Sequence, residues 1–311
     1  MLLFSHNPVM RAELAHQQRA MLRRGGRALR VLFVLALLVS AALVVGKPLL
    51  PQIAALLNET IFYIEEAHRG LLSTLTALLA ALLFVQHLLW VSQAAQQASA
   101  TISREKQART WESLVLTGID ARQIIIGKWW ATLRIMWDQH HTGLLLRGLA
   151  VVWLCLPNTD GITFSREVNS PTAVVLAAVV ALLYPLLNVS VAVATGVLSS
   201  LFGRRETTSF QVANLLQGAL MLAAFGLCFL TFALTSRTGW AQALPLVFLA
   251  PMDGGLLTIL SLLLEDRDVG RWQYVFGAIT LSTVIYAGLT ALLLRAAQSV
   301  AVRQNVLPPQ P

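Results

Sequence analysis

Long apolar runs alternate with short charged connections along this chain. Five predominantly apolar runs cover residues 29–46, 71–91, 173–198, 210–234 and 274–294. A helix needs about 20 residues to cross the hydrocarbon core of a bilayer, so each run is a candidate membrane span. A sixth, at 135–156, is diluted by charged and polar side chains. The pattern predicts an all-α, polytopic membrane protein with six transmembrane helices.

Composition supports this fold class. The chain has 311 residues, of which 56% are hydrophobic and only 12% are charged, a balance that excludes an ordinary water-soluble domain. No repeat or long polar linker divides it, so we expect a single transmembrane domain over residues 1–311. Cys155 and Cys228 lie in apolar stretches without metal-type spacing, which favours small buried side chains over metal ligands.

The positive charges predict the orientation of the spans. The net charge is +8, and lysine and arginine gather at the N-terminus, between the second and third spans, after the fourth span and at the C-terminus. Cytoplasmic loops of membrane proteins carry such an excess. We therefore expect a multi-pass protein of the plasma (inner) membrane with both termini in the cytoplasm. The basic character indicates membrane lipid, and no nucleic acid, as a partner.

The segment before the first span, residues 1–28, predicts a helix lying in the membrane interface. Asn7 can cap a helix that begins at Pro8, because proline has no amide hydrogen to satisfy. The helix would have arginines on one side and apolar residues on the other, namely Val9, Leu14, Met21 and Leu22. A solvated basic arm is the alternative.

The apolar stretch before the last span is broken by turn-forming residues. Within 240–270 the sequence PMDGG, residues 251–255, interrupts a run that is otherwise long enough to cross the bilayer. A full crossing here would place the C-terminus outside, against the charge pattern. We expect a re-entrant hairpin of two short helices in the outer leaflet, with PMDGG as its turn.

Two polar groups on the spans are candidate sites. In the second span four residues spaced at i, i+4, i+7 and i+11 share one helical face: Gln86, Trp90, Gln93 and Gln97. They either line a cavity or helix contact, or simply leave the bilayer. In the third span the group Asp138, His140 and His141 has either a metal or proton-handling role or an interfacial, salt-bridged one. We expect the second reading, because adjacent histidines point in different directions on a helix.

The third span has a recognisable start. Asp120 and Gln123 have the spacing of a helix-capping box. Trp129, Trp130 and Trp137 then follow beside basic residues, as in the aromatic belt at a membrane surface. Membrane entry is therefore expected to be gradual.

A charged island at residues 98–128 separates the second and third spans. If residues 98–117 are helical, Glu105, Arg109 and Glu112 fall at i, i+4 and i+7 and form an acid-base-acid ladder on one face. Such a helix could dock a cytoplasmic protein and pass its movement to the spans at either end. An ordinary solvated loop helix is the alternative.

The island resembles the cytoplasmic loop of the permease subunits of type-2 ATP-binding cassette (ABC) exporters, whose pattern is roughly ERExGTxExLLxTP followed by IxxGK. Matching residues are Arg104, Glu105, Thr110, Glu112, Leu114, Val115 and Thr117, followed by Ile124, Gly127 and Lys128. Arg109 stands where the family pattern has glycine, and Gly118 where it has proline. The N-terminal segment is similar to the family's elbow helix, and the outer hairpin is also a family trait.

This resemblance implies a homodimer or heterodimer of permease subunits, each coupled to a separate ATPase subunit that binds ATP and Mg. The chain itself would bind no cofactor. Coupling to the ATPase is implied for Arg104, Glu105, Arg109, Thr110, Glu112, Leu114 and Lys128. A substrate path or dimer seam along the second and fifth spans is implied for Gln86, Gln93, Gln211, Asn214 and Gln217.

The chain carries no nucleotide-binding signature of its own. It lacks GxxxxGKS and GxxxxGKT, and Lys128 is followed by Trp129 rather than by a magnesium-binding hydroxyl. We therefore expect a transport subunit and not an enzyme. One alternative is a permease-like subunit that transmits ATPase motion to an envelope partner without transport. A secondary transporter is less favoured, because neither repeated halves nor broken helices stand out in the sequence. An intramembrane enzyme is less favoured, because the sequence has no HExxH or GxSxG motif. The substrate stays open.

Overall fold

The computed structural model describes residues 8–23, 61–111, 119–155, 171–203, 205–235, 247–249, 251–255 and 271–306. Every regular element in these ranges is a helix, which confirms the predicted all-α class. The long helices are α1 (Pro8–Arg23), α4 (Ile61–Gln107), α6 (Ala121–Cys155), α7 (Pro171–Phe202), α8 (Glu206–Thr235) and α11 (Arg271–Val306). The first predicted span, 29–46, lies outside the described residues.

Four of these helices are long and apolar enough to cross a membrane, over Ala77–Gln107, Val174–Phe202, Glu206–Thr231 and Phe276–Gln304. They agree with the second, fourth, fifth and sixth predicted spans. In α6 the apolar stretch is only Gly143–Val152. Four of the six predicted spans are therefore confirmed as helices of bilayer length, whereas the apolar stretch of α6 is shorter than the predicted third span. The four long apolar helices support the prediction of a membrane protein.

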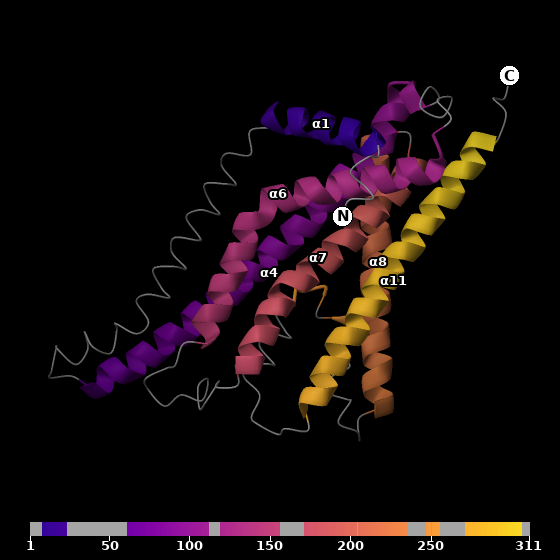
Figure 1. Ribbon diagram of the computed structural model, residues 1–311. Coiled ribbons are helices and arrows are strands. Elements are labelled where there is room, and N and C mark those ends of the chain that lie inside the picture. The colour runs from indigo at the N-terminus through magenta and orange to yellow at the C-terminus, as the bar shows by residue number, and fades with distance from the viewer. Residues whose placement is uncertain are drawn as a thin grey trace.

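The helices meet at one end of the bundle. Figure 1 shows α1 lying across that end, with the first part of α6 beside it, before α6 turns to run along α4. The α1 helix packs on α6, and α4 packs along α7. Pro8 is the first residue of α1, as the capping pattern predicted. Asp120 accepts a hydrogen bond from the Arg122 amide at 3.2 Å, so the predicted cap of α6 is confirmed.

Small residues let α4 and α7 approach closely. Gly196 of α7 faces Ala95 and Ala98 of α4, both fully buried. A Cβ atom built on Gly196 would lie 2.5 Å from the Ala98 Cβ and 2.8 Å from the Ala95 carbonyl oxygen. Small residues at such crossings allow the backbone contacts that hold helices together where the hydrophobic effect is weak.

The described part of the charged island, residues 98–111, is not one continuous helix. Instead α4 runs without a break to Gln107, and a turn follows at Ala108 and Arg109. Arg109 has a φ of 57°, in the left-handed region. The predicted ladder of Glu105, Arg109 and Glu112 is therefore wrong at Arg109, because a left-handed residue ends the helical register. Glu112 and Leu114 lie outside the described residues.

Replacing Arg109 with glycine should stabilise this turn. A left-handed backbone costs a residue with a Cβ roughly 1–2 kcal/mol, whereas glycine adopts it freely. We expect Arg109→Gly to raise the free energy of unfolding by about 1 kcal/mol, since the greater flexibility of unfolded glycine offsets part of the gain. Chemical denaturation in detergent would measure it. Glycine at the helical, exposed position Gln107 is the matched control and should destabilise; a loss at both positions would contradict the prediction.

The PMDGG segment forms the predicted turn, and four of its five residues are buried. The Gly254 amide donates to the Pro251 carbonyl at 3.2 Å, and Gly254 and Gly255 have φ values of 71° and 87°. Asp253 accepts the Gly255 amide at 2.8 Å. The preceding helical turn is held by Tyr286 of α11, whose hydroxyl donates to the Phe248 carbonyl at 2.9 Å. The rest of the predicted hairpin, within 240–270, lies outside the described residues.

Candidate functional site

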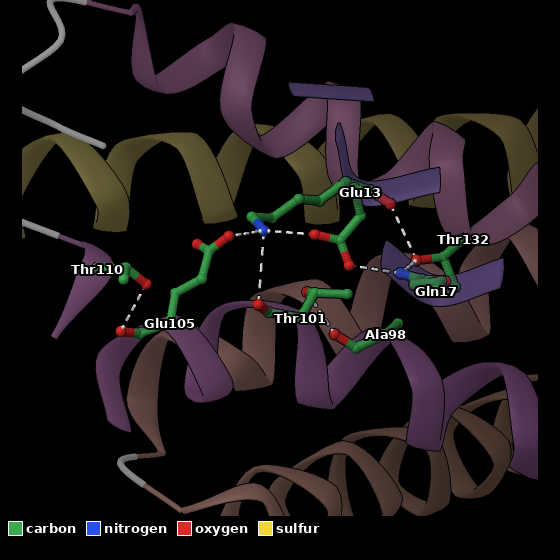
Figure 2. A network of polar contacts seen from close by, with 8 residues as sticks. Glu13, Gln17, Ala98, Thr101, Glu105, Thr110 and Thr132 are labelled. Carbon is green, nitrogen blue, oxygen red and sulfur yellow. Dashed lines mark hydrogen bonds and ion pairs between the residues drawn. The ribbon is translucent and has the colours of Figure 1, made fainter. Parts of the chain in front are cut away.

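A buried lysine lies where α1, α4 and α6 meet. The Lys128 ammonium of α6 is shielded completely from solvent, and its Nζ lies 2.6 Å from Glu105 Oε1 and 3.0 Å from Glu13 Oε2. It also reaches the Thr101 carbonyl at 3.5 Å. Figure 2 shows Glu13 and Glu105 on either side of one ammonium nitrogen. Three helices are therefore joined through a single cation.

The same face of α1 extends the network. Val9, Glu13 and Gln17 are spaced four residues apart and are all buried. The Gln17 amide donates to Glu13 Oε1 at 2.7 Å and to the Thr132 hydroxyl at 3.3 Å, and that hydroxyl donates to the Lys128 carbonyl at 2.9 Å. Polar contacts with α6 and α4 therefore position α1, in addition to the apolar side that the sequence suggested.

The charge balance fixes the protonation state of Lys128. Burial lowers the pKa of its ammonium, but the carboxylates of Glu13 and Glu105 outweigh burial and raise the pKa above the ordinary 10.5. A lysine pKa that is higher in the folded than in the unfolded protein stabilises the fold below the unfolded value. The stabilisation is thus fully present at neutral pH and is lost as the pH rises past the folded value.

Two further cations tie the end of α4 to the other helices. Arg104 pairs with Glu206 at the start of α8, with Nε to Oε1 at 2.8 Å and Nη2 to Oε2 at 3.4 Å. The Lys106 ammonium donates to the Leu201 carbonyl at the end of α7 and lies 3.1 Å from Gln304 Oε1 of α11. Gln304 in turn donates to the same carbonyl at 3.0 Å.

These contacts define a charged hub made of Glu13, Arg104, Glu105, Lys106, Lys128 and Glu206, with Gln17, Thr132 and Gln304 around it. A cleft of about 320 Å³ opens beside it between α1 and the end of α4. Its lining includes Val9, Glu13, Glu105 and Thr110. The hub can transmit a displacement of the end of α4 to every other long helix described, because each is attached to it directly.

Comparison with protein-family models, curated proteins and solved structures finds no match to this chain. The geometry therefore supplies the functional argument.

The structure brings together only part of the predicted coupling set. Arg104, Glu105 and Lys128 belong to the hub, whereas Arg109 and Thr110 are exposed just beyond it. Sequence reasoning missed Glu13, Glu206 and Gln304 as partners of these cations. The i, i+4 spacing of Glu13 and Gln17 in an otherwise basic segment was a usable signal. No sequence signal pairs Glu206 with Arg104, which lies 102 positions earlier in the chain.

The predicted path residues divide into inward and outward positions. Gln86 and Trp90 are buried, and Gln93 and Gln97 are half-buried, so this face of α4 points into the bundle. On α8, Gln211 and Asn214 are exposed and Gln217 is half-buried. The α4 residues are therefore less exposed than Gln211 and Asn214 of α8.

Asp138 and His141 of the acidic and histidine group of α6 are exposed. Asp138 lies 3.8 Å from Arg134 across one helical turn, and the His141 ring approaches the Asp138 carbonyl at 2.8 Å. The side chain of His140 lies outside the described set. Within that set no three histidine, cysteine or acidic residues gather as metal ligands. The salt-bridged interpretation of Asp138 agrees with this arrangement.

Proposed function

We propose that this chain is the membrane-spanning subunit of an ATP-driven ABC exporter. In this proposal a separate ATPase subunit, which binds ATP and Mg, docks at the charged end of the bundle. ATP binding would draw the ATPases together and pull on the end of α4. The resemblance of residues 104–128 to the family pattern motivates the proposal, and the charged hub gives it a physical route.

The observation that carries the proposal is the attachment of one protruding helix end to all the others. The end of α4 is bound to α1 and α6 through Lys128, to α8 through Glu206, and to α7 and α11 through Lys106. Such cross-links make the end of the bundle move as a unit, since packed and charge-paired elements shift together. A force applied at the exposed Arg109 and Thr110 would therefore reorient the spans rather than bend one loop.

A second subunit is supported by α8. Gln211, Asn214 and Gly218 share an exposed face of a helix that is otherwise apolar. Polar side chains on a span usually face protein, because lipid cannot satisfy them. No atom lies within 4 Å of a Cβ built on Gly218, so a partner helix could approach the backbone there. We propose that this face, rather than one inside a single subunit, forms the dimer seam.

The exposed turn beyond the hub offers the direct test. The full chain would be purified from the membranes of its native cell, and co-purified protein assayed for ATP hydrolysis. Arg109→Glu should weaken association with the ATPase by about tenfold or more, since reversing an interface charge removes an attraction and adds a repulsion. Arg303→Glu, an exposed reversal at the end of α11, is the matched control and should leave association unchanged.

Thermal unfolding of the permease should be the same for both variants, because neither side chain is buried. The proposal would be contradicted if no ATPase co-purified with the chain. An Arg109→Glu variant that associates and stimulates ATP hydrolysis normally would also contradict it. Glu105 is a poor choice for this test: its carboxylate holds Lys128, so its reversal would disturb folding as well as docking.

A further inference from the structure

A second buried cation lies away from the hub, inside the apolar part of α6. The Arg147 side chain is only 2% exposed. Its Nη1 donates to the Gly254 carbonyl at 2.6 Å, and its Nη2 lies 3.5 Å from the Leu83 carbonyl of α4. An ionisable residue at such a position is costly and usually marks a path or binding site. This arginine therefore needs a reason beyond packing.

The turn at 251–255 fits against Arg147 without spare room. A Cβ built on Gly254 would lie 2.6 Å from Arg147 Nη2 and 2.8 Å from His87 Nδ1. One built on Gly255 would lie 2.7 Å from Val180 Cγ1. Glycine at both places lets the backbone itself reach the guanidinium. The 251–255 turn therefore packs directly against the Arg147 guanidinium.

The partners of Arg147 come mostly from the 251–255 turn. The Gly254 carbonyl is neutral, and the negative charge that acts on the guanidinium is the carboxylate of Asp253 in the same turn. His87, which packs beside Arg147, meets the Asn188 amide at 2.9 Å through Nε2. Among the described residues, the turn therefore brings both the shortest hydrogen bond and the charge compensation of Arg147.

Some buried polar atoms near the 251–255 turn have no hydrogen-bond partner among the described residues. The Arg147 Nε and both polar atoms of the Gln86 amide are buried without a hydrogen-bond partner among the described residues. Gln86 contacts α6 at Gly143, one helical turn before Arg147, since a Cβ there would lie 1.8 Å from its Nε2. A buried polar group without a partner is unfavourable, because it has lost its hydrogen bonds to water. A ligand with oxygen acceptors could accept hydrogen bonds from Arg147 Nε and from Gln86 Nε2.

We infer that Arg147 and Gln86 form a binding site for the anionic oxygen group of an amphiphile, which the 251–255 turn occupies in this conformation. If the turn withdraws, it removes Asp253 and the Gly254 carbonyl and leaves an uncompensated buried cation. Such a charge is strongly unfavourable. Withdrawal is therefore coupled to the arrival of another anion. The inference rests on the proposed export function and narrows the cargo to molecules with a phosphate-like or carboxylate group on an apolar body.

The test measures how open the turn is. A Met252→Cys variant, in a background with Cys155 and Cys228 replaced by alanine, would be placed in nanodiscs of zwitterionic lipid and labelled with a polar thiol reagent. Dodecyl phosphate should raise the labelling rate about tenfold, as expected when a ligand favours a minor open state. Dodecanol should not. A similar rise with dodecanol would overturn the inference.

Variants assign the effect to the arginine. With Arg147→Gln the turn should be open without ligand, and dodecyl phosphate should add nothing; a retained response would overturn the inference. Arg134→Gln, which removes an exposed cation of the same helix, should respond like the parent. If Arg147→Gln fails to fold, Asp253→Asn replaces it: labelling should rise without ligand, and less dodecyl phosphate should give half of the effect. An unchanged ligand dependence in Asp253→Asn would contradict the inference.

Two further arms separate the sources of the anion. Inorganic phosphate alone should have no effect at the concentrations at which dodecyl phosphate acts, and a full effect would reject the amphiphile. Phosphatidic acid in the nanodisc should act like dodecyl phosphate if a lipid headgroup is the natural anion. The measurement needs no ATPase, so its failure leaves the docking test untouched, and failure of the docking test leaves this site standing.

Discussion

Replacing Lys128 with methionine is expected to destabilise the protein by about 3–5 kcal/mol. Methionine is of similar length but has no charge, so Glu13 and Glu105 would be left facing each other with no cation between them. Removing one member of a buried charged group has this order of cost, because the remaining charges stay desolvated. Unfolding of the purified protein in mixed detergent, followed by circular dichroism, would measure the loss.

The controls separate lost charge from lost packing. The triple variant Lys128→Met, Glu13→Gln, Glu105→Gln removes all three charges and should recover most of the stability, since a neutral group of similar volume often replaces a buried ion pair at little cost. Arg122→Met, an exposed cation near the start of the same helix, should change the free energy of unfolding by less than about 0.5 kcal/mol. A triple variant no more stable than the single one would contradict the proposed charge balance.

Replacing Gly196 with leucine is expected to cost more than about 3 kcal/mol. Overpacking a tight core usually costs about 1–3 kcal/mol, and here the obstacle includes backbone. The new Cβ alone would lie 2.8 Å from the Ala95 carbonyl oxygen. A side chain could rotate away, but a helix backbone cannot move without separating α4 from α7. Loss of stability in detergent, with loss of folded protein in membranes, is the expected result.

Open glycines provide the comparison. Nothing lies within 4 Å of a Cβ built on Gly288 of α11, and the residue is exposed. Gly288→Leu should therefore leave stability unchanged or raise it slightly, because leucine is the better helix former. A second variant, Gly196→Leu with Ala98→Gly, should recover only part of the loss, since the clash with the Ala95 carbonyl remains. Equal effects at Gly196 and Gly288 would show that the predicted clash does not exist.

The buried pairing of Lys128 with Glu105 changes how the island motif is interpreted. Lys128 and Glu105, which the resemblance assigns to coupling with an ATPase, are bound to each other inside one subunit. Their role under the proposed function is to make the end of the bundle rigid, and contact with a partner passes to the exposed residues beyond them. Loss of activity at Lys128 or Glu105 therefore says little about docking unless the stability of the variant is measured too.

The sequence by itself determined the class of this protein and the location of its main helices. Apolar runs of bilayer length can be recognised locally, because a helix in lipid must satisfy its own backbone. The start of α1 at Pro8, the cap of α6 at Asp120 and the turn at 251–255 are likewise local, since each depends on residues a few positions apart. The end of α4 was misjudged because the backbone conformation of Arg109 is not visible in a helix-permissive sequence.

Only the tertiary structure decided which charges meet. Lys128 lies 115 positions from Glu13 and 23 from Glu105, and Arg147 lies 107 from Gly254. Periodicity assigns a side chain to a helical face but does not say which helix lies opposite. That choice depends on crossings set by small residues such as Gly196 and on compensation of buried charge. Both are properties of contacts between distant segments, so no local pattern contains them.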